Sequence, residues 1–289
     1  MSNNVHNNTR RNLGRIFKTC KWGMIQGGTK TILQKFKLCK EAGFDGIELI
    51  NPLNFGQPGS EKEPEKNDPK ISEILAASRE TEMPIHGLVN ILGNRKAHIA
   101  SPDEATREKG RALLEQSVRN CHAYGGSAVL LVPGKVGGPD ETHDEVWKRS
   151  IEQVRKVLPV ASELGVRICI ETVWNKFCEK PEQLRDYVDE IDNPWFGVWL
   201  DLGNVRKLGP TENWVRTLGT RIVKLDVKGY TKKHGLKTKI GDGEINWPAV
   251  CDALAEINYC GWAAAEVRGG GREWLADIVE RMNRVLEIK

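Results

Sequence analysis

Short β-type runs alternate with longer stretches of helical periodicity along the chain, from residue 16 to residue 286. Eight such pairs can be counted, and this order is typical of βαβ units that build a parallel sheet. At 289 residues the chain has the usual length of a (β/α)8 barrel, which runs to roughly 250 residues before insertions. We therefore expect an α/β fold in which residues 16–289 form one TIM-barrel catalytic domain, preceded by a polar N-terminal arm over residues 1–15.

The boundaries of these elements can be placed from the same periodicity and from the residues that start and stop helices. Strands are expected at Ile16–Met24, Gly46–Ile50, Pro84–Val89, Ala128–Val132, Arg167–Glu171, Gly197–Asp201, Ile222–Val227 and Trp262–Val267. Helices are expected at Thr31–Ala42, Asp68–Thr81, Pro102–Tyr124, His143–Leu164, Pro181–Ile191, Glu212–Leu218, Trp247–Ile257 and Arg272–Leu286. Ser101 should cap the third helix, with Pro102 at its first position. Left-handed glycines are expected after helices at Gly43, Gly125, Gly165 and Gly261.

Composition narrows the range of partners. No apolar stretch approaches the ~20 residues of a membrane span, and 43 basic residues are mixed with 39 acidic ones, so no basic stripe for nucleic acid is visible. The seven cysteines form no C-x-x-C pair, and their odd number favours reduced thiols. No apolar segment follows Arg10-Arg11 to complete an export signal. We expect a cytoplasmic protein that binds neither membrane nor nucleic acid.

Four acidic residues stand at the ends of four successive expected strands in the second half of the chain. They are Glu171, Asp201, Asp226 and Glu266. In a barrel the strand ends lie on one face, so these carboxylates should converge, and a divalent cation is the simplest way to neutralise them. The other interpretation is that each acid pairs with a nearby lysine or arginine.

Strand alternation indicates which side chains point into the barrel. In the seventh strand Lys224, Asp226 and Lys228 share one face, and the opposite face is apolar and suits the surrounding helices. The charged face should therefore point inward, where an unpaired charge costs several kcal/mol. Oxygen ligands of this kind suit Mn²⁺ or Mg²⁺, with Co²⁺ as a substitute, better than a thiolate zinc site.

Several segments resemble a known family. They are Phe44-Asp-Gly-Ile-Glu-Leu49, Asp201-Leu-Gly-Asn204, Gly241-Asp-Gly-Glu-Ile-Asn-Trp247 and Gly261-Trp-Ala-Ala-Ala-Glu266. With the order of strands, they resemble the xylose isomerase-like TIM-barrel superfamily, and within it the sugar phosphate isomerase/epimerase group. The resemblance covers nearly the whole chain from about Ile16.

The resemblance implies a metal held by a glutamate, an aspartate, a histidine and a glutamate after strands five to eight. Glu171, Asp201 and Glu266 match, whereas the usual His-x-Lys-Asp of strand seven reads Asp226-Val-Lys228-Gly229. Asp226 can ligate through oxygen, but its negative charge should favour a harder ion.

The same resemblance implies proton transfer alpha to the carbonyl of a keto-sugar or sugar derivative. Glu171 and Glu266 would act as acid and base around an enediolate, giving isomerisation or epimerisation. One alternative is a metal-dependent lyase or hydratase acting on 3-keto-glycosides, because an enolate also permits β-elimination. Others are an endonuclease IV-like barrel, disfavoured because only His86 and His98 would lie near the site, and a sugar-binding barrel without catalysis.

A sugar would also need side chains around the mouth of the barrel. The expected substrate contacts are Glu48, His86, His98, Lys135, Trp174, Asn175, Asn204, Lys228 and Arg268. His86 has the competing interpretation of a hydrogen-bonded interior histidine, and Trp174-Asn175 that of loop packing. The glycines of Arg268-Gly-Gly-Gly-Arg272 suit a phosphate at a helix N-terminus or simply a flexible connection. The loop from Asn51 to Asp68 is interpreted as a solvated insertion or a lid. A homo-oligomer is compatible with the sequence.

Overall fold

The computed structural model describes residues 14–28, 31–51, 69–90, 98–136 and 141–288. Eight parallel strands follow one another in sequence order and close into a barrel in which β1 pairs with β8. The strands are β1 (Ile16–Lys21), β2 (Gly46–Asn51), β3 (Ile85–Asn90), β4 (Ala128–Leu131), β5 (Arg167–Ile170), β6 (Phe196–Asp201), β7 (Ile222–Val227) and β8 (Gly261–Ala265). The predicted (β/α)8 fold is confirmed.

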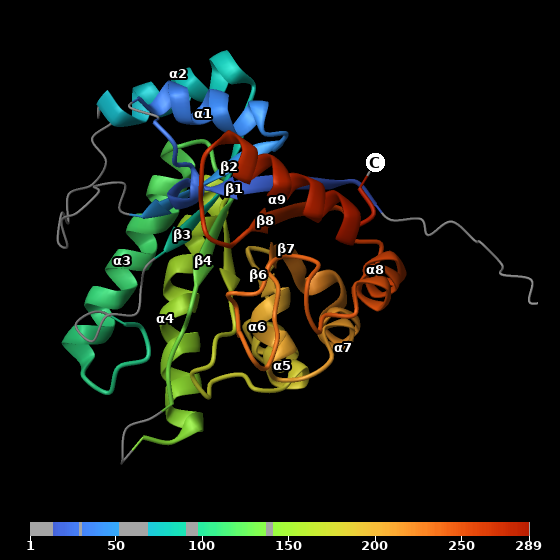
Figure 1. The fold of residues 1–289 in the computed structure, drawn as a ribbon. Helices are drawn as coiled ribbons and strands as arrows, with labels where there is room; N and C mark the ends of the chain where they lie inside the picture. The colour runs from blue at the N-terminus through green and yellow to red at the C-terminus, as the bar shows by residue number, and fades with distance from the viewer. Residues whose placement is uncertain (1–13, 29–30, 52–68, 91–97, 137–140, 289) are drawn as a thin grey trace, which may run out of the picture.

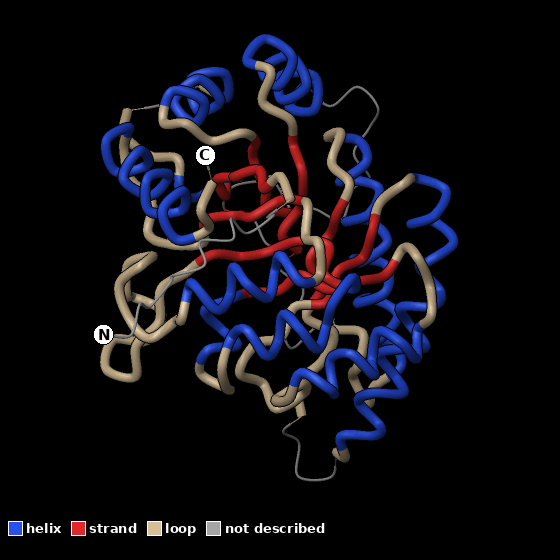
Figure 2. Tube along the Cα trace, turned by 90° about the vertical axis from the view of Figure 1, so that its right-hand side faces the viewer, coloured by secondary structure: helices blue, strands red, loops and turns tan. Residues whose placement is uncertain are grey.

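Helices lie around the outside of this barrel, as Figures 1 and 2 show. They are α1 (Ile32–Glu41), α2 (Pro69–Thr81), α3 (Glu104–Ala123), α4 (His143–Leu164), α5 (Pro181–Ile191), α6 (Leu202–Arg206), α7 (Thr211–Leu218), α8 (Trp247–Glu256) and α9 (Arg272–Val285). The short helix α6, which follows β6 directly, was not predicted. The first strand is shorter than expected, because a 3-10 turn replaces its end at Trp22–Met24.

The start of α3 differs from the prediction that Ser101 caps it. Asp103 is the N-cap, and its carboxylate accepts a 2.7 Å hydrogen bond from the Thr106 amide. The Ser101 hydroxyl instead accepts from the Asp103 amide at 3.2 Å. The helix therefore begins at Glu104, two residues after the expected proline, because an aspartate two residues farther along satisfies the free amides of the first turn.

Three of the four glycines predicted to be left-handed are so: Gly43, Gly125 and Gly165 have φ values of 97°, 79° and 67°. Gly261 was predicted wrongly. Asn258 takes the left-handed position after α8, with φ 53°, as asparagine tolerates this region better than most residues. Gly261 begins β8, where a Cβ atom would lie 3.0 Å from the Tyr259 hydroxyl.

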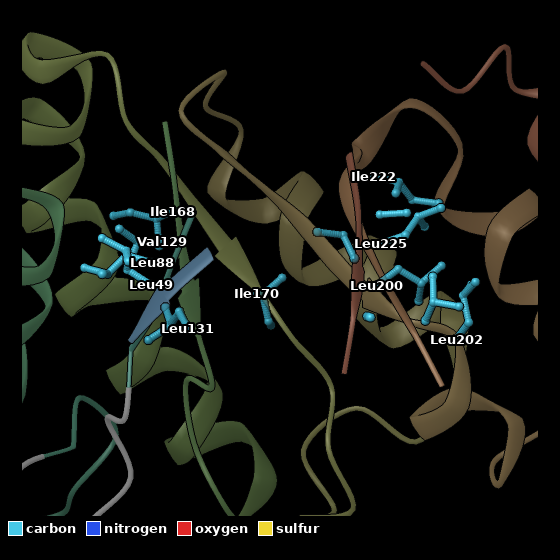
Figure 3. Packing of buried hydrophobic residues seen from close by; sticks show 14 of the residues in the cluster. Leu49, Leu88, Val129, Leu131, Ile168, Ile170, Leu200, Leu202, Ile222 and Leu225 are labelled. Atoms are coloured by element: carbon cyan, nitrogen blue, oxygen red, sulfur yellow. The ribbon is translucent and has the colours of Figure 1, made fainter. Parts of the chain in front are cut away.

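Apolar side chains fill two separate regions. The larger lies between the strands and the helices, and Figure 3 shows part of it, including Leu49, Leu88 and Leu200. The smaller joins Ala128, Leu130, Cys169 and Trp199 from three neighbouring strands. This division follows strand alternation, because successive side chains point to opposite faces.

Two expected segments, residues 1–13 of the arm and the loop over residues 52–68, lie outside the described residues. Within the described ranges no helix is long and apolar enough to span a bilayer.

Candidate active site

The four strand-end acids converge as the sequence predicted. Each of Glu171, Asp201, Asp226 and Glu266 offers a carboxylate oxygen, and these oxygens all lie within 4.8 Å of one another. We call this group the acid ring. Asp201 and Asp226 are fully buried, whereas 37% of the Glu266 side chain is exposed. The ring therefore lies in the barrel with one side open to solvent, at the strand ends where active sites of this fold are built.

Asp201 holds its place through the backbone that follows it. Its Oδ1 accepts hydrogen bonds from the amides of Gly203 and Asn204, both at 2.9 Å, so the same carboxylate caps α6. Its Oδ2 lies 2.6 Å from the Lys228 ammonium. Gly203 permits this approach, because a Cβ atom there would lie 2.8 Å from the Cβ of Lys228.

Asn204 contacts a second member of the ring. Its Nδ2 donates to Glu171 Oε1 at 2.9 Å, and the side chain is buried. The Glu171 amide donates to the Leu131 carbonyl at 2.9 Å, which ties the residue to the neighbouring strand. Glu171 is therefore oriented from both its backbone and its side chain.

A lysine that sequence analysis missed lies against the ring. The Lys21 ammonium donates to Asp226 Oδ2 and Glu266 Oε2, both at 2.7 Å, and lies 3.2 Å from Glu48 Oε1. Lys21 ends β1, and barrel closure places β1 beside β8. The signal was available in the sequence, because Lys21 shares a strand face with Phe17 and Thr19 and ends the strand that must pair with the eighth.

Lys228 approaches the ring from the end of β7. Its ammonium lies 3.0 Å from Glu266 Oε1 as well as 2.6 Å from Asp201 Oδ2. The two oxygens of Glu266 therefore face different lysines, Lys21 and Lys228. Lys228 was expected to contact substrate, and the structure places its buried ammonium against two acids of the ring.

Lys224 and Glu48 form a further ion pair within the barrel. Both side chains have no exposed surface, and the ammonium donates to Glu48 Oε2. The same ammonium lies 4.2 Å from the centre of the Trp199 ring, an arrangement that adds cation–π stabilisation. Glu48 was expected at the rim, and the structure encloses it instead.

Burial and mutual repulsion shift the proton affinities of the ring. Burial raises the pKa of Glu171 well above its usual range, and the charges of Asp201 and Glu266 add to the rise. Burial also raises the pKa of Asp226. Glu266 shifts the other way, because the nearby ammonium groups of Lys21 and Lys228 outweigh its burial and lower its pKa. The two glutamates therefore favour opposite protonation states.

The residues of the ring fit a divalent cation. Asp226 Oδ1 is buried and has no hydrogen-bond donor among the described residues, so it can serve as a ligand atom. The described barrel interior holds five carboxylates, of the ring and Glu48, against three ammonium groups, Lys21, Lys224 and Lys228. Two negative charges are left over when all are ionised, which matches one hard dication with oxygen ligands.

Neither His86 nor His98 contacts the ring within the described residues. His86 is the second residue of β3 and stacks on Trp262, the second residue of β8, with ring centres 5.0 Å apart. Both residues lie near the amino ends of their strands, opposite the end that carries the ring. Burial lowers the pKa of His86 well below its usual value. His98 is half-buried against Gly110 of α3, and no contact with the ring is recorded in the described structure.

The remaining expected contacts belong to loops. Trp174 is 43% exposed, donates its indole N–H to the Asn204 carbonyl at 2.9 Å and lies beneath the Lys207 ammonium at 4.0 Å. Asn175 donates to the Gly134 carbonyl at 2.5 Å, which joins two loops. The Lys135 and Arg268 side chains are exposed.

Comparison with known proteins assigns the chain to a family. A family model described as "Xylose isomerase-like TIM barrel" matches residues 36–286. The chain belongs to this family. D-psicose 3-epimerase from Ruminiclostridium cellulolyticum is 26% identical over 245 residues, covering 79% of this chain and 76% of that protein. Other relatives include 2-oxo-tetronate isomerase from Pectobacterium atrosepticum, 24% identical over 251 residues, which cover 83% of this chain and 87% of that protein.

Solved structures show the same fold. The apo crystal structure of 3-keto-D-glucoside 4-epimerase, YcjR, from E. coli superposes with a TM-score of 0.72 and 18% identity, over 94% of this chain and 98% of that one. The IOLI protein, solved with a bound zinc atom, gives a TM-score of 0.76 at 16% identity over 94% of this chain and 98% of that one.

Proposed function

We propose that this protein is a divalent-metal-dependent isomerase or epimerase that acts on a keto-sugar or sugar derivative through an enediolate. The observation that carries the proposal is the acid ring, whose four carboxylates offer oxygens within 4.8 Å of one another at the strand ends. The epimerase relatives and the zinc-bound structure of the same fold support it. Glu171, Asp201, Asp226 and Glu266 would hold the cation.

When bound, the cation would supply electrostatic stabilisation of the enediolate oxygens. The chain supplies the proton transfers. Glu266, which lies between the ammonium groups of Lys21 and Lys228, would act as the base, and Glu171, which Asn204 orients, would act as the acid. In epimerisation Glu266 would take the proton alpha to the carbonyl, and Glu171 would return one to the opposite face of the same carbon.

The other side chains of the site would bind and orient the sugar. Asn204 holds Glu171 at 2.9 Å, so the carboxyl oxygen that must deliver the proton has a fixed direction. The exposed indole of Trp174 offers an apolar face for a sugar ring near the same residue.

The experiment begins with the purified protein and a panel of ketoses and their phosphates. Chelation should abolish turnover, and Mn²⁺ or Mg²⁺ should restore it. Glu171→Gln and Glu266→Gln should each lower kcat by about 10²–10⁴-fold, the usual contribution of a general acid or base, while the melting temperature stays within a few degrees. The same exchange at exposed Glu179 is the matched control. Full activity after chelation, or in both glutamine variants, would contradict the proposal.

A second candidate is elimination or hydration of a 3-keto-glycoside. It is favoured by Asp226, which places a carboxylate in the ring where the family resemblance implies histidine. Proton NMR in deuterated water separates the two reactions. Epimerisation places deuterium on the carbon beside the carbonyl and keeps the glycosidic bond, whereas elimination releases the aglycone.

A further inference from the structure

The ammonium group of Lys21 lies against the acid ring. The Lys21 side chain is only 9% exposed, and its ammonium forms ion pairs with three carboxylates, those of Asp226, Glu266 and Glu48. Two of these acids are members of the ring proposed to hold a metal. An ammonium and a divalent cation therefore face the same carboxylates.

We propose that Lys21 competes with the divalent cation for Asp226 and Glu266 and thereby sets the affinity of the site. The inference rests on the proposed metal dependence. Lys21 would be a specificity-determining residue that acts on the ion and does not exchange a proton with the sugar.

The oxygens that Lys21 occupies support this role. On Asp226, Lys21 takes Oδ2, while Oδ1 is buried and without a donor among the described residues. On Glu266, Lys21 takes Oε2 and Lys228 lies beside Oε1. A dication that binds through both acids must share or displace a hydrogen bond that is already charge-assisted and short.

The other lysines of the interior have different partners. Lys224 pairs with Glu48, and Lys228 lies closest to Asp201. Among the described ion pairs, Lys21 is the only cation within 4 Å of Asp226. Asp226 adds a fourth carboxylate to the ring, and the Lys21 ammonium contacts that carboxylate directly.

The strand that carries Lys21 also provides a control. Lys18 lies three residues earlier on β1, has the opposite strand parity and pairs with Asp45 at 3.6 Å. Its side chain is 10% exposed, close to the 9% of Lys21. Lys18→Met therefore removes the same charge from the same strand at similar burial, but on the face directed away from the ring.

The test is calorimetric titration of Mn²⁺ into chelator-treated protein at fixed pH and ionic strength, with melting curves to verify folding. Lys21→Met should tighten Mn²⁺ binding by about tenfold or more, because a neighbouring positive charge is lost. Lys21→Gln, which keeps a polar group in the cavity, should tighten it in the same direction. Lys18→Met should leave the affinity within about threefold of wild type.

Competition at Asp226 is tested in the Asp226→Asn background. There, Lys21→Met should tighten Mn²⁺ binding by clearly less than in the wild type, because uncharged asparagine attracts both the ammonium and the dication less strongly than aspartate does. An undiminished effect would overturn the assignment of Asp226 as the contested ligand.

The outcomes separate this inference from the proposed function. Wild-type affinity or weaker binding in both Lys21 variants overturns the inference and leaves metal dependence standing. If Lys21→Met binds Mn²⁺ and the wild type does not, the inference is supported, because Lys21 then occupies the cation site in the wild type. The same result overturns metal dependence. Failure of every variant to bind Mn²⁺ overturns both.

Discussion

Two groups of buried charges lie inside the same barrel and differ in how their charges are matched. The Lys224–Glu48 pair has one base for one acid, and both side chains are completely enclosed. The acid ring has four carboxylates against the ammonium groups of Lys21 and Lys228, and Glu266 is partly open to solvent. The pair is complete without a ligand, whereas the ring has negative charge to spare. Unmatched charge therefore distinguishes the candidate site more clearly than burial does.

Breaking the Lys224–Glu48 ion pair should have the largest effect on stability. Among the described ion pairs, Lys224→Met leaves the enclosed Glu48 with Lys21 as its one remaining partner, at 3.2 Å. Removal of one partner of a buried ion pair costs about 3–5 kcal/mol. We expect a loss of this size in the free energy of unfolding, measured by urea denaturation.

The double variant Lys224→Met/Glu48→Leu is the matched control for that change. It replaces both charges by apolar groups and should recover most of the lost stability. A double variant no more stable than the single one would mean that Glu48 contributes through Lys21 and that the two groups of charges are not separate.

Removing the support of one ring acid should have an intermediate effect. Asn204→Ala deletes the 2.9 Å hydrogen bond to Glu171 Oε1. Loss of such an orienting partner typically costs 10–100-fold in metal affinity or activity, so we expect a fall of this size in Mn²⁺ affinity or in kcat on the accepted ketose. Asn213→Ala, at an exposed position of α7, should change neither. Equal effects of the two changes would argue against a role for Asn204 in orienting the ring.

The smallest effect concerns His86, at the opposite end of the barrel. Its pKa is lowered well below the usual value by burial and by Lys224, so protons bind the unfolded chain, with a pKa of about 6.5, more strongly than the native one. Native stability should therefore fall as pH drops below about 6.5, by about 1 kcal/mol over the next unit.

Urea denaturation at pH 7.0 and 5.5 measures this slope. His86→Gln should flatten it, whereas His234→Gln, which removes an exposed histidine, should leave it unchanged. An unaltered slope in His86→Gln would show that other groups govern the acid response.

The sequence predicted the barrel and the acid ring for the same reason. Strand alternation and strand ends are local patterns, and Asp201, Asp226 and Glu266 can each be located within a segment of a few residues. Lys21 is different, because it meets Glu266 only when the barrel closes, 245 residues along the chain. The enclosure of Glu48 by Lys224 also depends on contacts across the barrel, 176 residues apart. Helix α6 was missed because five residues give too little periodicity to detect.

Asn204 connects the surface of the molecule to its interior. Its backbone carbonyl accepts the indole N–H of exposed Trp174, and its side-chain amide holds buried Glu171. Its own amide is held by Asp201 Oδ1. A ligand that moves the indole of Trp174 would also move Asn204, which orients Glu171. Binding of a sugar at the surface would therefore be coupled to the alignment of the buried carboxyl group.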